Sequence, residues 1–161
     1  KKKNARVNFY IPDRFKDGYG ASKELIIILI KQFDPDFIIF LDCGSNSYEA
    51  IKYTKTKKIE SLIIDHHNTS NPCPEANVFI NPKKKCDYNN FDYLCTTFLT
   101  YLFIDLYIKL NKEKILLENQ LIYVLLATVA DVMPIRGVNK ILAKQILSKF
   151  DSEKNFIIKN N

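Results

Sequence analysis

The chain has 161 residues, of which 47% are hydrophobic and 26% are charged, and its formal net charge is +6 at pH 7. This composition is typical of a folded globular protein and excludes a disordered chain, and no apolar run reaches the roughly 20 residues of a membrane-spanning helix. We therefore expect a cytoplasmic protein with no membrane partner, whose positive charge is compatible with nucleic acid.

The first predicted elements are a strand and a helix separated by a polar loop. Val7–Ile11 alternates well enough for a short strand, which Pro12 ends. The loop Asp13–Gly20 closes with two glycines, which can adopt positive φ or let a ligand come close. Ser22 is a suitable N-cap for a helix that runs to about Phe33. The inner stripe of this helix consists of Leu25, Ile26, Leu29 and Ile30.

Strands and helices alternate in the middle of the chain. Phe37–Leu41 predicts a strand that is apolar on both faces, as in a parallel sheet covered by helices. A helix from about Ser47 to Thr56 separates it from the next strand, Ser61–Ile64. This order predicts right-handed βαβ units, and hence an α/β fold with a parallel, Rossmann-like sheet.

A long loop and a helical part follow the sheet. The loop, residues 68–90, is rich in Asn, Pro, Ser and Lys, and only Val78–Ile80 within it is strand-like. The helices are expected from Phe91 to about Leu110, from Lys112 to about Ala130 and from Asn139 to about Phe150. Leu121–Val129 is apolar nearly all round, so we expect this helix to be buried.

The length favours a single domain over residues 1–161. Its sheet portion is expected at about 7–82 and its helical portion at about 91–150. Neither a Cys-x-x-Cys pair nor the spacing of a zinc site is present, so we expect reduced thiols at Cys43, Cys73, Cys86 and Cys95.

Carboxylates and the two histidines of the chain stand at the ends of apolar elements. Asp42 follows one predicted strand, Asp65-His66-His67 follows the next, and Asp131 comes directly after the apolar helix. Because ligands of open α/β sheets bind beyond the carboxyl ends of the strands, we expect Asp42 and Asp65 to project into one crevice. Oxygen donors with one or two imidazoles suit Mn²⁺ or a related divalent ion better than thiolate-bound zinc.

Each of these residues also has a simpler explanation. An Asp after a strand or helix is often a turn former or a cap, which applies to Asp42 and Asp131. Consecutive strand residues point to opposite faces, so we expect only one of His66 and His67 to bind an ion directly, while the other hydrogen-bonds a phosphate or donates a proton. Asp65 is suited to accept the far N–H of an imidazole. A hydrolytic metal site and a structural polar cluster both stay open from the residues alone.

Several ordered motifs resemble the DHH phosphoesterase superfamily. These are Asp65–Asn68, the preceding Leu41–Gly44 and the following Ala127–Pro134. Further motifs look like the RecJ branch of single-strand-specific DNA exonucleases, namely Ile11–Phe15 with Gly18–Gly20, then Asn81-Pro82, and Leu94-Cys95 opening a helix. The resemblance extends from about residue 7 to 147.

The resemblance implies a DHH domain and a two-metal phosphodiesterase that uses Mn²⁺ or Mg²⁺. Asp42 would bridge the two ions, and His66 and Asp131 would complete one of them. Catalytic roles would fall to Asp65, which orients the ligands, and to His67, which faces the scissile phosphate or the leaving oxygen. RecJ-branch proteins degrade single-stranded DNA from the 5′ end in repair and recombination. The expected partners are therefore single-stranded DNA and other DNA-repair proteins, with the chain acting as a monomer.

The resemblance also implies a substrate-binding set and shows two departures. The substrate or its phosphate would be bound by Arg14, Gly18, Tyr19, Gly20 and Asn81. The family's first motif, Asp-x-Asp, should precede Val7, but Lys1–Arg6 contains nothing that can stand for it. We therefore expect a domain that is incomplete at its N-terminus, binds one Mn²⁺ at best and is nearly inactive alone. The usual glycines after Leu94-Cys95 are replaced by Thr96-Thr97.

Two other functions fit parts of the sequence. One is a DHH phosphatase or oligonucleotidase for small substrates, against which the RecJ-like segment Arg14–Gly20 argues. The other is a non-catalytic nucleic-acid-binding remnant, which the lysines of Lys52–Lys58 and Lys83–Lys85 motivate, although such runs are also common as solvated surface. The aromatic residues that could stack on bases, or else anchor loops, are Phe15, Tyr19 and Tyr88.

Overall fold

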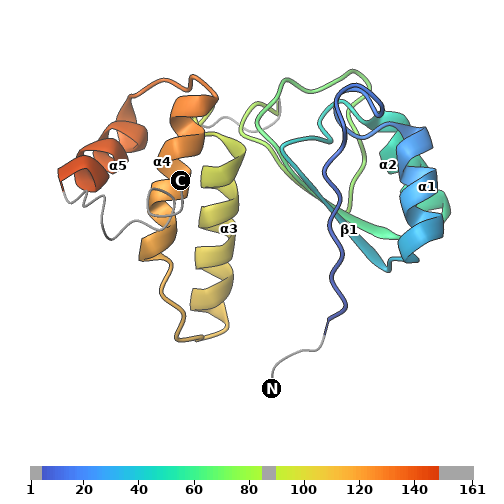
Figure 1. Cartoon of the computed structure of the whole chain (residues 1–161), viewed down its shortest axis with the longest axis horizontal. Coiled ribbons are helices and arrows are strands. Elements are labelled where there is room, and N and C mark those ends of the chain that lie inside the picture. Colours follow the sequence, from blue (N-terminus) through green and yellow to red (C-terminus); the bar gives the residue numbers. More distant parts are fainter. Residues whose placement is uncertain (1–4, 85–89, 149–161) are drawn as a thin grey trace. The chain divides into compact units, whose positions relative to one another are not determined.

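The computed structural model of the chain describes residues 5–84 and 90–148. The chain divides into two compact units, residues 1–87 and residues 88–161. The first unit contains the sheet and the second contains only helices among its described residues (Figure 1). The boundary lies between the predicted sheet portion and the predicted helical portion, and the single domain stays a prediction.

The sheet of the first unit has three parallel strands, which confirms the α/β class. They are β1 (Phe37–Leu41), β2 (Glu60–Ile64) and β3 (Val78–Ile80), in the order β1-β2-β3. The register pairs Leu41 with Ile64 and Ile64 with Ile80, so the three strands end in one row. The residues that follow this row are therefore brought together at one edge of the sheet.

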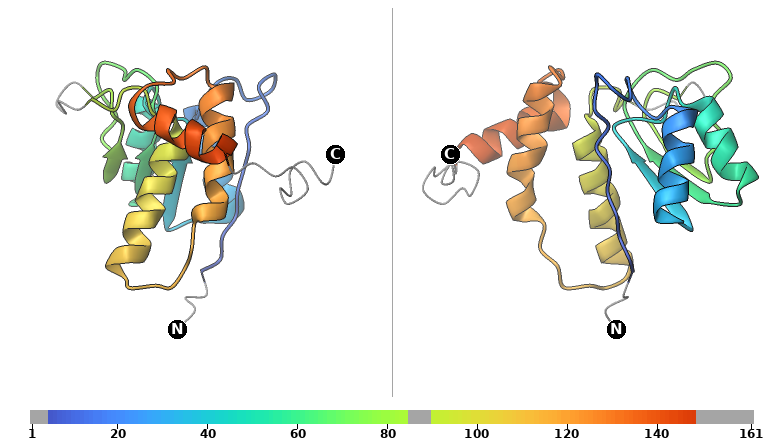
Figure 2. Two further views of the ribbon diagram at one scale, coloured as in Figure 1. Left: turned by 90° about the vertical axis from the view of Figure 1, so that its left-hand side faces the viewer. Right: turned by 45° about the vertical axis from the view of Figure 1, so that its right-hand side comes forward.

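Two helices cover one face of this sheet, α1 (Lys23–Phe33) and α2 (Tyr48–Thr56) (Figure 2). The predicted N-cap is confirmed, because the Ser22 hydroxyl accepts a hydrogen bond of 3.1 Å from the Leu25 N–H. The buried core between helices and sheet contains Ala21, Ile26, Phe40, Ala50, Ile51 and Ile63. Burial of each large aliphatic side chain contributes about 1.5–3 kcal/mol to the stability of the fold. This core therefore fixes the strands and the positions of their ends.

The opposite face of β1 is open, which corrects the prediction that the strand is covered on both faces. Phe40 is only 3% exposed, whereas Phe37, Ile39 and Leu41 are 46%, 51% and 52% exposed. Successive strand residues alternate between faces, so α1 and α2 bury only one set. The apolar sequence of β1 therefore did not show whether one face of the strand or both faces are covered.

The strand predicted at Val7–Ile11 is wrong. Residues 5–13 have no regular secondary structure, and the side chains of Val7, Phe9 and Ile11 are exposed. A strand requires a neighbour that supplies the hydrogen bonds of its ladder, and the described residues provide none here. The alternation of apolar and polar residues was thus insufficient to form a strand without a neighbouring strand to pair with.

The second unit contains α3 (Thr96–Leu110), the 3₁₀ turn η1 (Glu118–Gln120), α4 (Leu121–Ala130) and α5 (Gly137–Ser148). The predicted helix starts at Phe91 and Lys112 are wrong, because the two helices begin at Thr96 and Leu121.

Each wrong start falls on a turn. Residues 91–95 form a turn before α3, with the Leu94 N–H bonded to the Phe91 carbonyl at 3.0 Å. Lys112 has φ 54° and follows the end of α3, where the Glu113 N–H returns to the Ile108 carbonyl at 3.0 Å.

Helix α4 is only partly buried, contrary to the prediction from its apolar sequence. Its buried residues are Val124, Leu125 and Thr128, while Tyr123, Leu126 and Val129 are exposed. The predicted third helix is confirmed as α5, although its predicted last residue, Phe150, lies outside the described residues. None of the helices in the described ranges is both long enough and apolar enough to cross a membrane.

Candidate metal centre and active site

The candidate site begins where the three parallel strands end. Asp42, Asp65 and Asn81 directly follow the last residues of β1, β2 and β3. The ladder continues for one more step, because the Asp42 N–H bonds the Ile64 carbonyl at 3.1 Å and the Asp65 N–H bonds the Ile80 carbonyl at 3.0 Å. Asp42 then adopts φ 59°, which turns the chain out of the strand. The sheet thus fixes where each loop starts.

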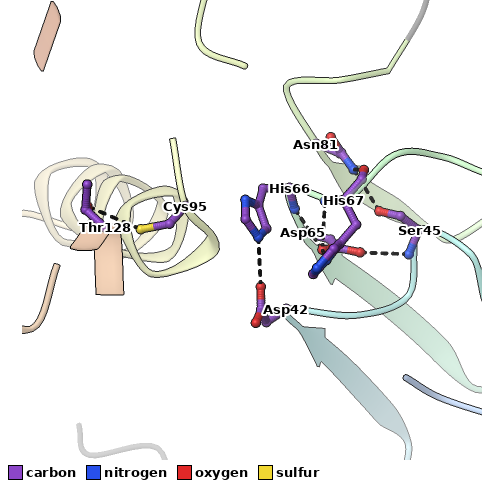
Figure 3. A network of polar contacts seen from close by, with 8 residues as sticks. All are labelled: Asp42, Ser45, Asp65, His66, His67, Asn81, Cys95 and Thr128. Atoms are coloured by element: carbon purple, nitrogen blue, oxygen red, sulfur yellow. Dashed lines mark hydrogen bonds and ion pairs between the residues drawn. The ribbon is translucent and has the colours of Figure 1, made fainter. Parts of the chain in front are cut away.

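Asp65 is the buried anchor of the site, with 1% of its surface exposed. Its Oδ2 accepts the Ser45 N–H at 3.0 Å, and its Oδ1 accepts the N–H groups of His66 at 2.7 Å and His67 at 3.2 Å (Figure 3). Burial raises the pKa of Asp65, but the hydrogen bonds from Ser45 and His67 outweigh it and hold the pKa below its usual range. A carboxylate anion is therefore held inside the protein.

The ring of His67 is oriented by this carboxylate. Its Nδ1 lies 2.7 Å from Oδ1 of Asp65, and its side chain is 53% exposed. Because an ionised carboxylate only accepts hydrogen bonds, the network assigns the Nδ1–H form to His67 and leaves Nε2 as the other ring nitrogen. Asp65 therefore orients the imidazole of His67, as a carboxylate behind a metal-binding or proton-transferring histidine would.

His66 turns toward Asp42. Its side chain is only 9% exposed, and its Nε2 lies 3.5 Å from Oδ1 of Asp42 (Figure 3). The rings of His66 and His67 meet edge to face, with their centroids 4.6 Å apart. Asp42, His66 and His67 each offer one ligand atom, and these atoms lie within 4.8 Å of one another. We refer to these three residues as the ligand group.

His66 and His67 do not have the extended backbone from which only one of them was expected to bind an ion directly. Strand β2 ends at Ile64, and both histidines belong to the loop that follows. Their rings therefore converge instead of alternating between faces. Which of the two binds an ion directly stays a prediction.

The chemistry of the ligand group fits a divalent ion that prefers oxygen and nitrogen donors, such as Mn²⁺. The neighbouring Cys43 is not among the residues whose ligand atoms converge. Its burial, together with the charges of Asp65 and Asp42, raises the pKa of the Cys43 thiol to about 11. Cys43, Cys73 and Cys95 are free cysteines, and Cys86 lies outside the described residues.

Ser45 belongs to the site but was missed from the sequence. It is fully buried, its N–H reaches Asp65, and its carbonyl accepts the Ser70 N–H at 3.1 Å. Its only sequence signal is its place in the loop after Asp42. Position in a loop does not reveal which partners a serine will meet, so no residue pattern identified it.

Asn81 was predicted to contact substrate or its phosphate, and its amide is used within the protein. It is 4% exposed, and its Nδ2 donates to the Ser45 hydroxyl at 2.7 Å and to the His67 carbonyl at 2.8 Å. Its Oδ1 accepts the Lys83 N–H at 2.7 Å. A direct phosphate contact stays a prediction and would require one of these bonds to open.

The predicted substrate loop, residues 13–20, is held by its own hydrogen bonds. Oδ2 of Asp17 accepts the Tyr10 hydroxyl at 2.7 Å and the Asp13 N–H at 2.8 Å. Oδ1 of Asp13 accepts the Phe15 N–H at 2.8 Å. Gly18 has φ 77°, and the other glycine of the loop has φ 75°. Both therefore adopt a positive φ, which was one of the two roles expected of them.

This loop presents a cation and two aromatic rings to solvent. Phe15 is 98% exposed, and the guanidinium carbon of Arg14 lies 4.4 Å from the centre of the Tyr19 ring. Such a cation over an aromatic face keeps both side chains in a defined arrangement. Substrate binding by the loop stays a prediction.

Asp131 lies in the second unit, one residue past the end of α4, as predicted. Its side chain is exposed, and its N–H bonds the Ala127 carbonyl at 2.9 Å. Its role as a metal ligand stays a prediction. In the same unit the Cys95 sulfur lies 3.5 Å from the Thr128 hydroxyl (Figure 3). This hydroxyl donates to the Val124 carbonyl at 2.7 Å.

Four of the lysines that motivated nucleic-acid binding have local partners. Lys55 forms an ion pair of 2.8 Å with Glu75. The ammonium groups of Lys52, Lys57 and Lys84 lie 5.7, 5.5 and 5.1 Å from the ring centres of Tyr48, Tyr53 and Phe79, respectively. These contacts favour a solvated surface. Lys85 and Tyr88 lie outside the described residues.

Comparisons with known proteins support the motif assignments. A model of the DHH family, N-terminal domain, matches residues 1–129. The single-stranded-DNA-specific exonucleases RecJ of Salmonella typhimurium, Escherichia coli and Bacillus subtilis are 30%, 28% and 29% identical over 92%, 93% and 88% of this chain. The chain spans only 27%, 28% and 17% of the length of these relatives.

The fold is also found in a solved structure. The crystal structure of exonuclease RecJ bound to manganese superposes with a TM-score of 0.73 at 21% sequence identity. The match covers 87% of this chain and 35% of the other. It confirms the fold that the βαβ order predicted.

Proposed function

The chain belongs to the DHH family, and on this premise we propose that it is the metal-dependent phosphodiesterase core of a RecJ-like exonuclease acting on single-stranded DNA. The observation that carries the proposal is the ligand group, Asp42, His66 and His67, at the carboxyl edge of a parallel sheet. The names of the relatives supply the substrate, and the manganese of the solved RecJ structure supports the choice of ion.

In this proposal Asp42 and His66 hold a divalent ion, Mn²⁺ or Mg²⁺. When bound, such an ion supplies positive charge to the phosphoryl oxygens and lowers the pKa of a water molecule. Asp65 keeps Nδ1–H of His67 engaged at 2.7 Å, so Nε2 is the nitrogen available to meet the scissile phosphate or to exchange a proton with the leaving oxygen. The assignment of Asp131 as a further ligand rests on the resemblance alone.

The 13–20 loop is proposed to hold the nucleic acid strand. Arg14 is suited to pair with a phosphate, since a guanidinium forms bidentate hydrogen bonds to it. Phe15 and Tyr19 are exposed, and stacking on one base contributes about 1–3 kcal/mol. Cleavage from the 5′ end, a role in DNA repair and recombination, repair-protein partners and a monomeric state complete the proposal and rest on the resemblance. The proposed cytoplasmic location rests on the composition of the sequence.

The experiment that tests this proposal compares three substrates. The chain is extended at its N-terminus by the two-aspartate motif of a RecJ relative and is supplied with Mn²⁺. We expect mononucleotide release from a 5′-phosphorylated single strand, much slower release from a duplex, and slow hydrolysis of a dinucleotide. His66→Ala should abolish the release. Faster hydrolysis of the dinucleotide than of the strand would favour the small-substrate phosphatase or oligonucleotidase instead.

A further inference from the structure

One buried side chain connects the loops that follow all three strands. Asn81 comes directly after β3, and its Nδ2 donates to the Ser45 hydroxyl at 2.7 Å and to the His67 carbonyl at 2.8 Å (Figure 3). Ser45 lies in the loop after β1, and His67 lies in the loop after β2. The Oδ1 atom of Asn81 accepts the Lys83 N–H at 2.7 Å, which fixes the amide itself.

These bonds hold the backbone of His67 from two sides. Its carbonyl accepts from Asn81, and its N–H donates to Oδ1 of Asp65 at 3.2 Å. Its ring is more than half exposed, so burial alone does not fix its position. Ser45 links both supports, because its N–H binds Asp65 at 3.0 Å and its hydroxyl accepts from Asn81.

Direct contact of Asn81 with substrate fits this arrangement poorly. Both hydrogens of a carboxamide nitrogen are accounted for by Ser45 and His67. A new bond to phosphate would leave the buried Ser45 hydroxyl or the His67 carbonyl without its donor, and buried polar groups without partners are unfavourable.

We infer that Asn81, acting with Ser45, is a positioning residue that places the imidazole of His67 relative to Asp42 and His66. The inference rests on the proposed function for its catalytic meaning. Its structural content is independent of that function: the Asn81 amide, through the His67 backbone, keeps the ring on Asp65. Partners that orient a ligand or catalytic histidine in this way typically change affinity or activity by about 10- to 100-fold when removed.

The first test observes the His67 ring in the metal-free chain. The sequence has two histidines, so nitrogen NMR at one fixed, mildly alkaline pH separates their signals once His66→Ala identifies one of them. We expect a single Nδ1–H form of His67 in the wild type and averaged ring-nitrogen signals in Asn81→Ala. Ser45→Ala should produce a smaller change in the same direction, and it supplies the result if Asn81→Ala does not fold.

Asn77→Ala is the matched control. Asn77 also bonds a neighbouring strand through its side chain, since its Oδ1 accepts the Ser61 N–H at 2.9 Å, but it precedes β3 at the other end of the sheet. The His67 signals should keep their wild-type form in this variant. Wild-type signals in both Asn81→Ala and Ser45→Ala would overturn the inference.

The second test uses the extended chain in which hydrolysis is measured. Asn81→Ala should lower kcat by about tenfold or more while KM stays within about twofold of the wild type, because a positioning residue acts on the reacting group. A raised KM with unchanged kcat would instead indicate direct substrate contact and contradict the inference. If no variant hydrolyses DNA, the proposed function fails, and the NMR result still decides the role of Asn81.

Discussion

The strand ends and the 13–20 loop are both organised by a carboxylate, but they expose their functional side chains differently. At the strand ends, Asp65 is 1% exposed and accepts hydrogen bonds from the backbone N–H groups of Ser45 and His66 in the loops that follow β1 and β2. In the loop, Asp17 binds Tyr10 and Asp13, while Phe15 stays 98% exposed. The carboxylate that organises the strand ends is therefore buried, whereas the loop is a separate support for exposed groups.

This difference predicts two classes of variant. Changes at the strand ends should reduce stability together with metal binding or catalysis, because the same hydrogen bonds serve both. Changes at the exposed side chains of the loop should reduce substrate binding and leave stability unchanged. A strand-end variant that loses metal binding or catalysis without losing stability, or a loop variant that loses stability, would contradict this distinction.

The largest effect is expected for Asp65→Ala. It leaves the N–H groups of Ser45, His66 and His67 without their buried acceptor. We expect the free energy of unfolding to fall by about 3–5 kcal/mol, measured by urea denaturation. Asp65→Asn, which keeps the volume and one acceptor oxygen, should lose less. A loss below about 1 kcal/mol in Asp65→Ala would show that Asp65 is not the anchor.

Substitution of one glycine in each region compares the two regions directly. Gly44 has φ 107°, and a Cβ there would lie 3.1 Å from Ile63 and 3.2 Å from Phe40, both in the core. Gly18 has φ 77°, but a Cβ there would meet nothing within 4 Å. Gly44→Ala should therefore destabilise by about 2–4 kcal/mol and Gly18→Ala by about 1–2 kcal/mol. Equal losses by thermal or urea unfolding would contradict the separation of loop from core.

Substitutions in the loop should act on nucleic acid binding alone. We expect Tyr19→Ala or Phe15→Ala to weaken binding of a fluorescent single strand by about 5- to 150-fold, from the energy of one base stack. The free energy of unfolding should stay within about 0.5 kcal/mol of the wild type. Ile28→Ala removes an exposed apolar side chain from α1 and serves as the control. Unchanged affinity in both loop variants would exclude stacking by this loop.

The smallest effect on stability is expected from a change of pH. The pKa of Asp65 is lower in the folded chain than in the unfolded chain, so its stabilising effect is complete above the unfolded value, near 4, and is lost as the pH falls through the folded value. The stability difference between wild type and Asp65→Asn should therefore shrink below about pH 4. A difference that grows on acidification would reverse the sign of the assigned shift.

Sequence reasoning located the strand ends and their polar residues well, for a physical reason. An apolar run that stops at a charged residue, as at Asp42 and Asp65, marks a core boundary, and parallel pairing brings successive boundaries to one edge. The same reasoning failed at Val7–Ile11, where the described residues provide no pairing neighbour. Residue patterns encode burial, but they do not encode which neighbours are present.

Ser45 and Asn81 illustrate what lies beyond the pattern. Their importance comes from bonds between residues that are 36 positions apart in the sequence, and these bonds depend on loop conformations that no periodicity specifies. The resemblance singled out Asn81, but a motif names a residue without showing its partners within the protein. Ser45 had no comparable signal.

The central claim is that Asp42 and His66 hold a divalent ion at the carboxyl edge of the sheet. Titration of the chain with Mn²⁺, followed by electron paramagnetic resonance, tests it directly in wild type, Asp42→Ala and His66→Ala. Asp36→Ala, at the opposite end of β1, is the control. We expect both site variants to weaken Mn²⁺ binding by at least about tenfold and the control to match the wild type. Equal Mn²⁺ affinity in all four proteins would contradict the claim.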